Sequence, residues 1–274
     1  YLRFVFFTGI TKFSQVSIFS ELNNVTNVSM YDEYAGMLGI TKEELCGQLS
    51  EDIEVLATKM HLTKEQTLDK LTENYDGYHF SAYSPDVFNP YSLFNCFAQG
   101  KLGSYWFASG TPTYLINMMR KYHVLPTGIT RVEADESEFD APTEDMTTMM
   151  PLLYQSGYLT IKDYNRDYNY YTLDIPNKEV KIGLTKALIP SYVTGNTLAT
   201  TNTARRIAQA LDKQDMDGAL HLLQDFLGTV PYCNVTNHEG HYQQMLYIIF
   251  TLLTNYLVDV EVHTPRGRVD IVLL

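Results

Sequence analysis

The sequence predicts a mixed α/β fold that is mostly helical, and three observations lead to this prediction. The opening run of residues 2–7 and the closing run of residues 269–274 are apolar and strand-like. Between them, helix-start signals and stretches with helical apolar spacing recur along the chain. Only short pairs of strand-like segments interrupt the helices. We therefore expect helical regions combined with small sheets.

Composition limits the class of protein. The chain has 274 residues, of which 45% are hydrophobic, enough for one or two cores. Its 32 acidic and 20 basic side chains give a formal net charge of -12, which disfavours non-specific attraction to nucleic acid or anionic lipid. The 3 cysteines are far apart and indicate neither a disulfide framework nor a zinc cluster, so a reducing cytoplasm fits best. No apolar run reaches the roughly 18 residues of a membrane span.

The first third of the chain contains a predicted strand and several helix starts. Residues 2–7 are typical of a strand buried on both faces of a parallel sheet, and the polar loop that follows occupies the edge where open α/β sheets bind ligands. Two capping-box patterns, beginning at Thr41 and Thr63, predict helices over 41–60 and 63–74. Residues 75–80 hold an Asp-Gly pair between aromatic residues, which predicts a tight turn or hairpin.

The remaining elements follow from proline, acidic and alternating patterns. Asn89-Pro90 begins a helix with proline in its first turn, and residues 110–113 begin another in the same way. Residues 131–145 contain many acidic residues, which predicts a connecting segment exposed to solvent. A helix over 149–156, strands over 158–164 and 170–175 and a helix after Pro176 form the outline of a winged-helix module. Helices near 203–213, 215–228 and 238–256 and a hairpin over 258–274 complete the chain.

Several familiar catalytic motifs are missing. No G-x-x-x-x-G-K-[ST] loop occurs, so these residues lack the cradle and lysine that hold a triphosphate. His238 and His241 are spaced one residue too closely for the zinc motif H-E-x-x-H. The 21 tyrosines and 13 phenylalanines offer stacking platforms for bases, but their apolar neighbours favour packing as their role.

The strongest chemical pattern lies near the end of the sequence. Glu239 is placed at the start of a long predicted helix, Glu261 in the first strand of the closing hairpin and Asp270 after its turn. A helix carboxylate followed by a hairpin that carries Asp is half of a metal-dependent nuclease site, because such sites hold Mg²⁺ with oxygen ligands from several elements. The other half would be a carboxylate and a lysine on the next strand. The competing interpretation is that Asp270 is an ordinary residue at a strand edge.

Longer strings in the chain resemble the bacterial family of predicted AAA-type ATPases, whose members carry a C-terminal domain similar to the PD-(D/E)xK nuclease superfamily. The resemblance covers almost the whole chain, and residues 267–272 (GRVDIV) match the start of the nuclease core. Ser109 stands where the family pattern often has threonine. The other matching strings are residues 8–23 (TGITKFSQVSIFSELN), 75–80 (YDGYHF), 89–92 (NPYS), 105–112 (YWFASGTP) and 156–161 (SGYLTI).

The resemblance implies a domain order and a set of site residues. Thr8 would be a sensor-like residue facing the γ-phosphate with Lys12 close by, whereas Asp270 would bind the metal with Glu239 as the helix carboxylate. From the hairpin pattern, Glu261 is a further predicted metal ligand. ATP and Mg²⁺ would serve the full-length protein only. The implied segments are the edge of an ATPase core (1–30), a helical lid (31–130), a winged-helix-like segment (131–195), a helical linker (196–232) and the start of a nuclease-like domain (233–274).

Three functions remain open at this stage. The first is an ATP-driven switch coupled to metal-dependent DNA cleavage in the full-length protein. The second is a regulatory module in which a degenerate nuclease domain binds a protein partner without cutting. The third, a winged-helix transcription regulator, is weaker because residues 149–190 hold few Lys and Arg for phosphate contacts. Because both ends run through apolar segments where natural termini are usually polar, we expect the sequence to be a fragment that is inactive alone.

One prediction concerns nucleotide binding. We expect residues 1–274 alone neither to hydrolyse ATP nor to bind it with micromolar affinity, because they lack the phosphate loop and its lysine. Isothermal calorimetry with ATP and Mg²⁺ measures this directly. A saturable isotherm in the micromolar range would show that the chain holds a nucleotide by other means.

Overall fold

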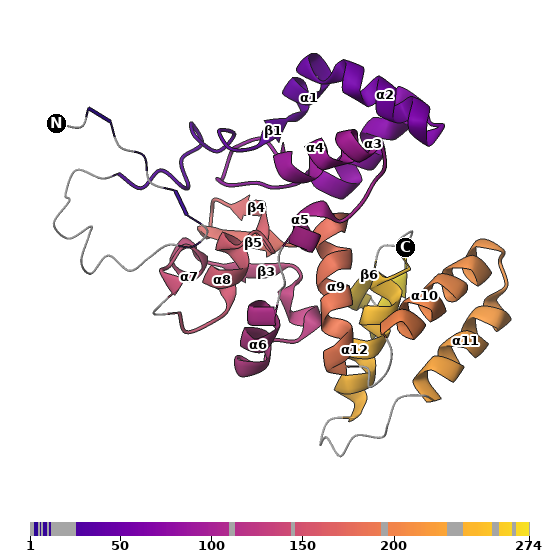
Figure 1. Cartoon of the computed structure of the whole chain (residues 1–274). Helices are drawn as coiled ribbons and strands as arrows, with labels where there is room; N and C mark the ends of the chain where they lie inside the picture. Colours follow the sequence, from indigo (N-terminus) through magenta and orange to yellow (C-terminus); the bar gives the residue numbers. More distant parts are fainter. Residues whose placement is uncertain are drawn as a thin grey trace. The chain divides into compact units, whose positions relative to one another are not determined.

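A computed structural model of the chain is shown in Figure 1. It describes residues 3–4, 6, 8–9, 11, 26–109, 113–143, 146–192, 197–228, 238–253, 258–264 and 267–273. The chain forms two compact units, each built from two segments. Unit 1 comprises Tyr1–Trp106 and Ile129–Asn177, and unit 2 comprises Phe107–Gly128 and Lys178–Leu274. The boundaries of the five predicted segments stay a prediction.

Unit 1 contains a group of helices and a three-stranded sheet. Its first segment forms β1 (Ile40–Thr41), α1 (Lys42–Gln48), α2 (Ser50–Met60), α3 (Lys64–Tyr75), β2 (Val87–Phe88), α4 (Pro90–Gln99) and the beginning of α5 (Tyr105–Ser109). Its second segment forms β3 (Val132–Ala134), α7 (Glu136–Phe139), α8 (Met150–Gln155), β4 (Thr160–Asn165) and β5 (Tyr170–Asp174).

Side-chain caps start several helices of unit 1, α1 and α3 among them. Thr41 and Thr63 each accept a hydrogen bond from the backbone three residues later, and the Glu44 and Gln66 side chains accept bonds from the two threonine N–H groups in return. The two predicted capping boxes are therefore confirmed. The predicted helix over 41–60 is wrong in one respect, because it is broken at Leu49. Leu49 leaves helical geometry with φ -111° and ψ 21°, so α1 ends there and α2 begins.

The helices of unit 1 enclose one apolar core. Tyr75 is fully buried within it, and its hydroxyl both donates to the Gly103 carbonyl and accepts from the Gly103 N–H, each at 2.9 Å. A buried phenol whose oxygen is satisfied on both sides adds the packing of its ring without leaving a polar atom unpaired. The other buried members of the core are Leu45, Ile53, Leu56, Leu71, Phe88, Leu93 and Cys96.

The sheet of unit 1 is antiparallel, with strand order β3-β5-β4. The predicted strands over 158–164 and 170–175 are confirmed as β4 and β5. The predicted solvated connector is wrong in part, because β3 and α7 form within residues 131–145. Ala134 is buried and Val132 half-buried while Glu133 stays exposed, so this alternation lets an acidic segment pair with β5. The winged-helix interpretation stays a prediction.

Unit 2 is mainly helical and ends in a β-hairpin. Beyond the end of α5, its elements are α6 (Thr113–Lys121), η1 (Pro126–Ile129, reaching into unit 1), α9 (Lys178–Tyr192), α10 (Thr197–Asp212), α11 (Met216–Gly228), α12 (His238–Thr251), β6 (Val258–Thr264) and β7 (Gly267–Leu273). The predicted helices and the closing hairpin are present, so their type is confirmed. Their bounds differ, because α10 begins before residue 203 and α12 ends before residue 256. Figure 1 shows α10 and α11 running beside one another.

Helix α12 supplies much of the buried surface of unit 2. Met245, Ile248 and Ile249 are fully buried in it. Gln244, also buried, donates from Nε2 to the Thr127 hydroxyl at 2.8 Å and accepts from the Thr127 N–H at 3.1 Å. These two bonds fix η1 to α12. Within the described ranges, no helix has both the length and the hydrophobicity needed to cross a membrane.

The opening run of the sequence departs from its predicted strand. Of residues 2–7, the structure describes only Arg3, Phe4 and Phe6, and none of them lies in a strand. Phe4 is 82% exposed and Phe6 is 49% exposed, so the predicted burial on both faces is wrong at these positions. A parallel strand of that kind requires flanking strands, and the described part of the chain pairs none with this run.

The α2 helix provides a test of the core with neighbouring residues. Leu56 is 1% exposed whereas Val55, the residue before it, is 56% exposed. Leu56→Ala should lower the free energy of unfolding by about 2–5 kcal/mol, because it removes buried methyl groups and leaves a cavity. Val55→Ala should change it by no more than about 0.5 kcal/mol. Urea unfolding followed by circular dichroism measures both, and equal effects would contradict the observed core.

Candidate functional site

The predicted nuclease residues fall on one helix and one hairpin of unit 2. Helix α12 begins at His238, which makes Glu239 its second residue. In the hairpin, Val260 pairs with Ile271 and Val262 pairs with Val269. Position 261 therefore falls opposite position 270, and directly opposed positions share a face of a hairpin. The side chains of Glu239, Glu261 and Asp270 lie outside the part of the chain that the structure describes, so their convergence stays a prediction.

The hairpin register adds one acidic position that sequence spacing did not single out. Asp259 pairs with Val272. This pair lies two residues along the strands from the pair formed by positions 261 and 270. Positions two apart on a strand share a face, so Asp259 is placed on the face of Glu261 and Asp270. The two-residue spacing of Asp259 and Glu261 in the sequence could have indicated their shared face, and the register adds the relation to Asp270.

For the two residues predicted to contact nucleotide, Thr8 and Lys12, the structure gives little information. Thr8 is described and exposed, and it lies outside any strand. Lys12 lies outside the described residues. Their predicted roles beside the γ-phosphate stay predictions.

A polar cluster that sequence reasoning missed surrounds the Asp76-Gly77 turn in unit 1. The His79 imidazole lies 3.0 Å from the Asp86 carboxylate, measured between Nδ1 and Oδ1. This contact lowers the pKa of Asp86 below its usual value. The His79 backbone is held as well, because the Thr160 hydroxyl accepts from its N–H at 2.7 Å and donates to its carbonyl at 2.8 Å.

Lys162 joins the same turn to the sheet. Its amino group donates to the carbonyls of Gly77, at 2.7 Å, and Pro176, at 3.0 Å. Burial of the amino group lowers the pKa of Lys162, and the nearby carboxylates of Asp86, Asp174 and Asp76 oppose that shift. Gly77 has φ +89°, and a Cβ there would lie 2.5 Å from the Pro176 carbonyl oxygen. The turn therefore requires glycine at this position.

Three side-chain oxygens of this segment are buried without a hydrogen-bond partner. They are one of the two carboxylate oxygens of Asp76, Oδ1, and the hydroxyl oxygens of Ser81 and Ser84. Burial raises the pKa of Asp76, reinforced by the nearby Asp86 carboxylate and opposed by a hydrogen bond from the Gly77 N–H. The described residues include no group of three His, Cys, Asp or Glu side chains able to hold a metal ion. The cluster thus orders the turn, and the metal prediction rests on the hairpin of unit 2.

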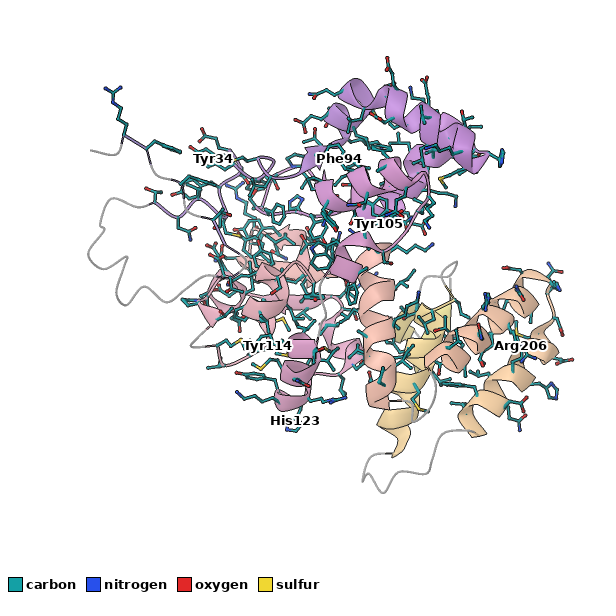
Figure 2. All side chains as sticks on the ribbon, viewed as in Figure 1. Tyr34, Phe94, Tyr105, Tyr114, His123 and Arg206 are labelled. Atoms are coloured by element: carbon teal, nitrogen blue, oxygen red, sulfur yellow. The ribbon has the colours of Figure 1, made fainter. Side chains whose placement is uncertain are left out.

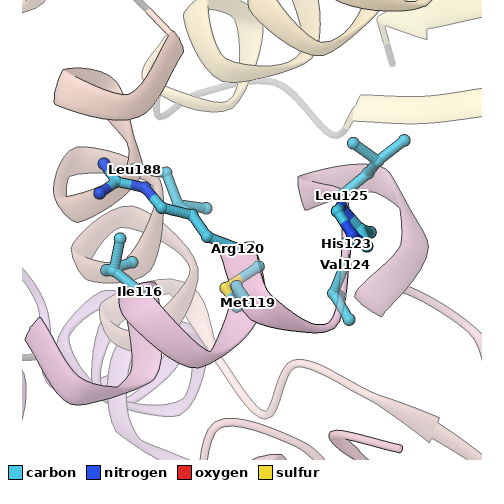
Figure 3. A pocket seen from close by; sticks show the side chains of 7 residues that line it. All are labelled: Ile116, Met119, Arg120, His123, Val124, Leu125 and Leu188. Atoms are coloured by element: carbon cyan, nitrogen blue, oxygen red, sulfur yellow. The ribbon is translucent and has the colours of Figure 1, made fainter.

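Unit 2 also contains an apolar hollow of about 250 Å³ (Figure 3). Figure 3 shows the Arg120 side chain reaching toward Leu188 of α9, with His123 and Leu125 on the other side of the hollow. Ile116, Met119 and Val124 complete its lining. The hollow is small and open, and it brings no carboxylate or nucleophile together.

Comparisons with known proteins support one part of the predicted resemblance. Residues 237–274, which cover α12 and the hairpin, match the PD-(D/E)XK nuclease superfamily. Across its whole length, the chain is 28% identical to a protein of Azotobacter chroococcum mcd 1 described as "Uncharacterized protein in vnfD 5'region". The alignment covers 100% of this chain and 52% of that protein, so the chain spans about half the length of this relative. No solved structure matches the chain. The ATPase part of the resemblance stays a prediction.

The contact between His79 and Asp86 predicts a specific acid dependence. The pKa of Asp86 is lower in the folded state than in the unfolded state. The Asp86 carboxylate therefore makes its full contribution to the free energy of unfolding above about pH 4, and that contribution is lost as the pH falls through the folded-state pKa. His79→Leu should raise the pKa of Asp86 and flatten the loss of stability at low pH. The Asp86 side chain is 54% exposed, so solvent screening keeps the effect small.

Carbon-detected NMR titration of the Asp86 carboxyl group measures the shift. His221→Leu, a substitution on α11 in unit 2, provides the control and should leave the titration of Asp86 unchanged. If Asp86 titrates at the same pH in the wild type and in His79→Leu, the histidine is not the cause of the lowered pKa.

Proposed function

We propose that α12 and the β6–β7 hairpin form part of a metal-dependent nuclease centre in the full-length protein. The observation that carries this proposal is the superfamily match over residues 237–274, which covers this helix and this hairpin. Asp270 stands in the second strand, opposite Glu261 by register, and Glu239 stands near the start of the helix. An acidic position in each element is the arrangement that such a centre requires.

The donor chemistry suits a hard divalent cation. Carboxylate oxygens are the protein ligands that Mg²⁺ prefers, and Asp270 and Glu239 would hold the ion. A bound Mg²⁺ would polarise a phosphodiester and favour deprotonation of an attacking water. Glu261 would be a further ligand of the ion. The carboxylate and lysine of an E-x-K element would complete the centre in the full-length protein.

The proposal extends to ATP-dependent control of this centre. In it, Thr8 and Lys12 contact nucleotide at the edge of an ATPase core, and residues 31–130 act as its helical lid. Support comes from the resemblance of residues 8–23 and 75–80 to predicted AAA-type ATPases. The proposed winged-helix-like segment is supported by the strand order β3-β5-β4, with α7 and α8 between β3 and β4 along the chain. DNA would be the substrate of the C-terminal domain.

A regulatory module without nuclease activity is the second candidate function. The formal net charge of -12 favours it, because acidic surfaces repel the phosphates of DNA. In this alternative, the nuclease-like domain binds a protein partner and Asp270 has no ligand. The two functions differ in whether a conservative change at Asp270 alters DNA cleavage.

A plasmid-nicking assay on the purified full-length protein tests the choice. We expect Mg²⁺-dependent nicking that EDTA abolishes and that Asp270→Asn lowers by at least about 100-fold, since even second-shell changes at metal sites cost about 10–100-fold. Asn keeps the size of Asp and removes the charge. Asp69→Asn, at an exposed position of α3, is the matched control and should nick as the wild type does.

The same assay with and without ATP tests nucleotide control.

Equal nicking by the wild type and Asp270→Asn would assign the activity to another site or to contamination. The regulatory module would then be the better description of the protein.

A further inference from the structure

A connected series of aromatic rings crosses the sheet of unit 1. Tyr83 meets Tyr164 edge-on with ring centroids 6.0 Å apart, and Tyr164 lies 4.6 Å from Tyr171. Tyr171 in turn packs edge-on against Phe139 at 5.3 Å. The series therefore runs from fully buried Phe139 to Tyr83, which is 67% exposed. Its buried end anchors the exposed ring in place.

The segment around Tyr31 is held beside the exposed end of this series. The Tyr83 N–H donates to the Asp32 carboxylate at 3.1 Å, and the Tyr154 hydroxyl contacts the Met30 sulfur at 3.3 Å. Tyr31 and Tyr34 stack with centroids 6.4 Å apart, and both are exposed. Tyr34 is labelled in Figure 2. We define the tyrosine–carboxylate patch as Tyr31, Asp32, Tyr34, Tyr83, Glu136 and Tyr164.

The patch is negatively charged as well as aromatic. Residues 31–34 include Asp32 and Glu33 and no basic residue. Burial raises the pKa of Tyr171 to about 12, and nearby negative charges add to this shift. The Glu136 carboxylate makes the larger contribution and the Asp32 carboxylate a smaller one. These carboxylates therefore act on the inner end of the aromatic series. The faces of aromatic rings attract cations, and neighbouring carboxylates strengthen that attraction.

We propose that the tyrosine–carboxylate patch is a docking surface for a segment of a partner protein rich in arginine or lysine. Exposed tyrosine rings beside carboxylates complement guanidinium and ammonium groups in charge and offer them aromatic surface to pack on. The same carboxylates oppose a nucleic-acid partner, since stacking platforms for bases normally line a positively charged groove. This surface lies in unit 1 and is independent of the proposed nuclease centre.

Fluorescence anisotropy on the full chain tests the proposal. The probe is a labelled peptide of six arginines spaced by glycines, in 150 mM salt so that long-range attraction to the acidic chain is screened. Tyr83→Ser should weaken binding about fivefold by removing an exposed ring face. Glu136→Gln should weaken it about twofold. Tyr34→Ser replaces Tyr83→Ser if circular dichroism shows that the latter does not fold.

Matched controls separate the patch from general charge attraction. Tyr114→Ser removes a ring that is 63% exposed on α6 in unit 2 (labelled in Figure 2), and Glu65→Gln removes a first-turn glutamate from α3 as Glu136→Gln does from α7. Both should bind the peptide as the wild type does. Equal losses in the controls, or no binding of the peptide, would overturn the proposal. Tighter binding of a single-stranded oligonucleotide that depends on Tyr83 would overturn it in favour of a base-stacking platform.

Discussion

The backbone around the Asp76-Gly77 turn continues past the end of α3, and two side chains of β4 supply part of the hydrogen bonding that it needs there. Thr160 pairs with both the N–H and the carbonyl of His79, and the Lys162 amino group takes the Gly77 carbonyl. An unpaired backbone group away from water costs as much as a lost hydrogen bond, so these contacts are required if the turn is to be buried. They join the helices of unit 1 to its sheet.

In unit 2, the hairpin register has the corresponding role for the proposed nuclease centre. Antiparallel pairing of β6 with β7 places position 261 opposite position 270, and a shift of one residue in the pairing would move every side chain of one strand to the other face. Within β6, valine alternates with acidic residues, so the acidic positions share one face of the strand. In the proposed centre, this backbone pairing would bring positions 261 and 270 together before a metal ion binds.

Local signals predicted much of the fold, and long-range pairing accounts for what they missed. The helix starts at Thr41 and Thr63 are encoded within four residues, so the sequence alone predicted them. The break at Leu49 has no proline, and the nearby glycine, Gly47, lies within α1 and not at the break. The strand within the acidic segment depends on β5, nearly 40 residues further along. At the candidate sites, Asp270 was predicted from its turn and the family resemblance. The cluster of His79, Asp86 and Lys162 was missed because no spacing rule links positions on different elements.

The pairing of His79 with Thr160 has a consequence for the order of folding during synthesis. The two residues are 81 positions apart in the sequence. At about 5–20 residues per second, a ribosome needs about 4–16 s to make the intervening chain. Helices α1 to α4 can form their core during that interval, while the turn after α3 still lacks the hydroxyl and amine that complete it. The nascent chain therefore exposes this turn to water, chaperones and proteases until β4 has emerged.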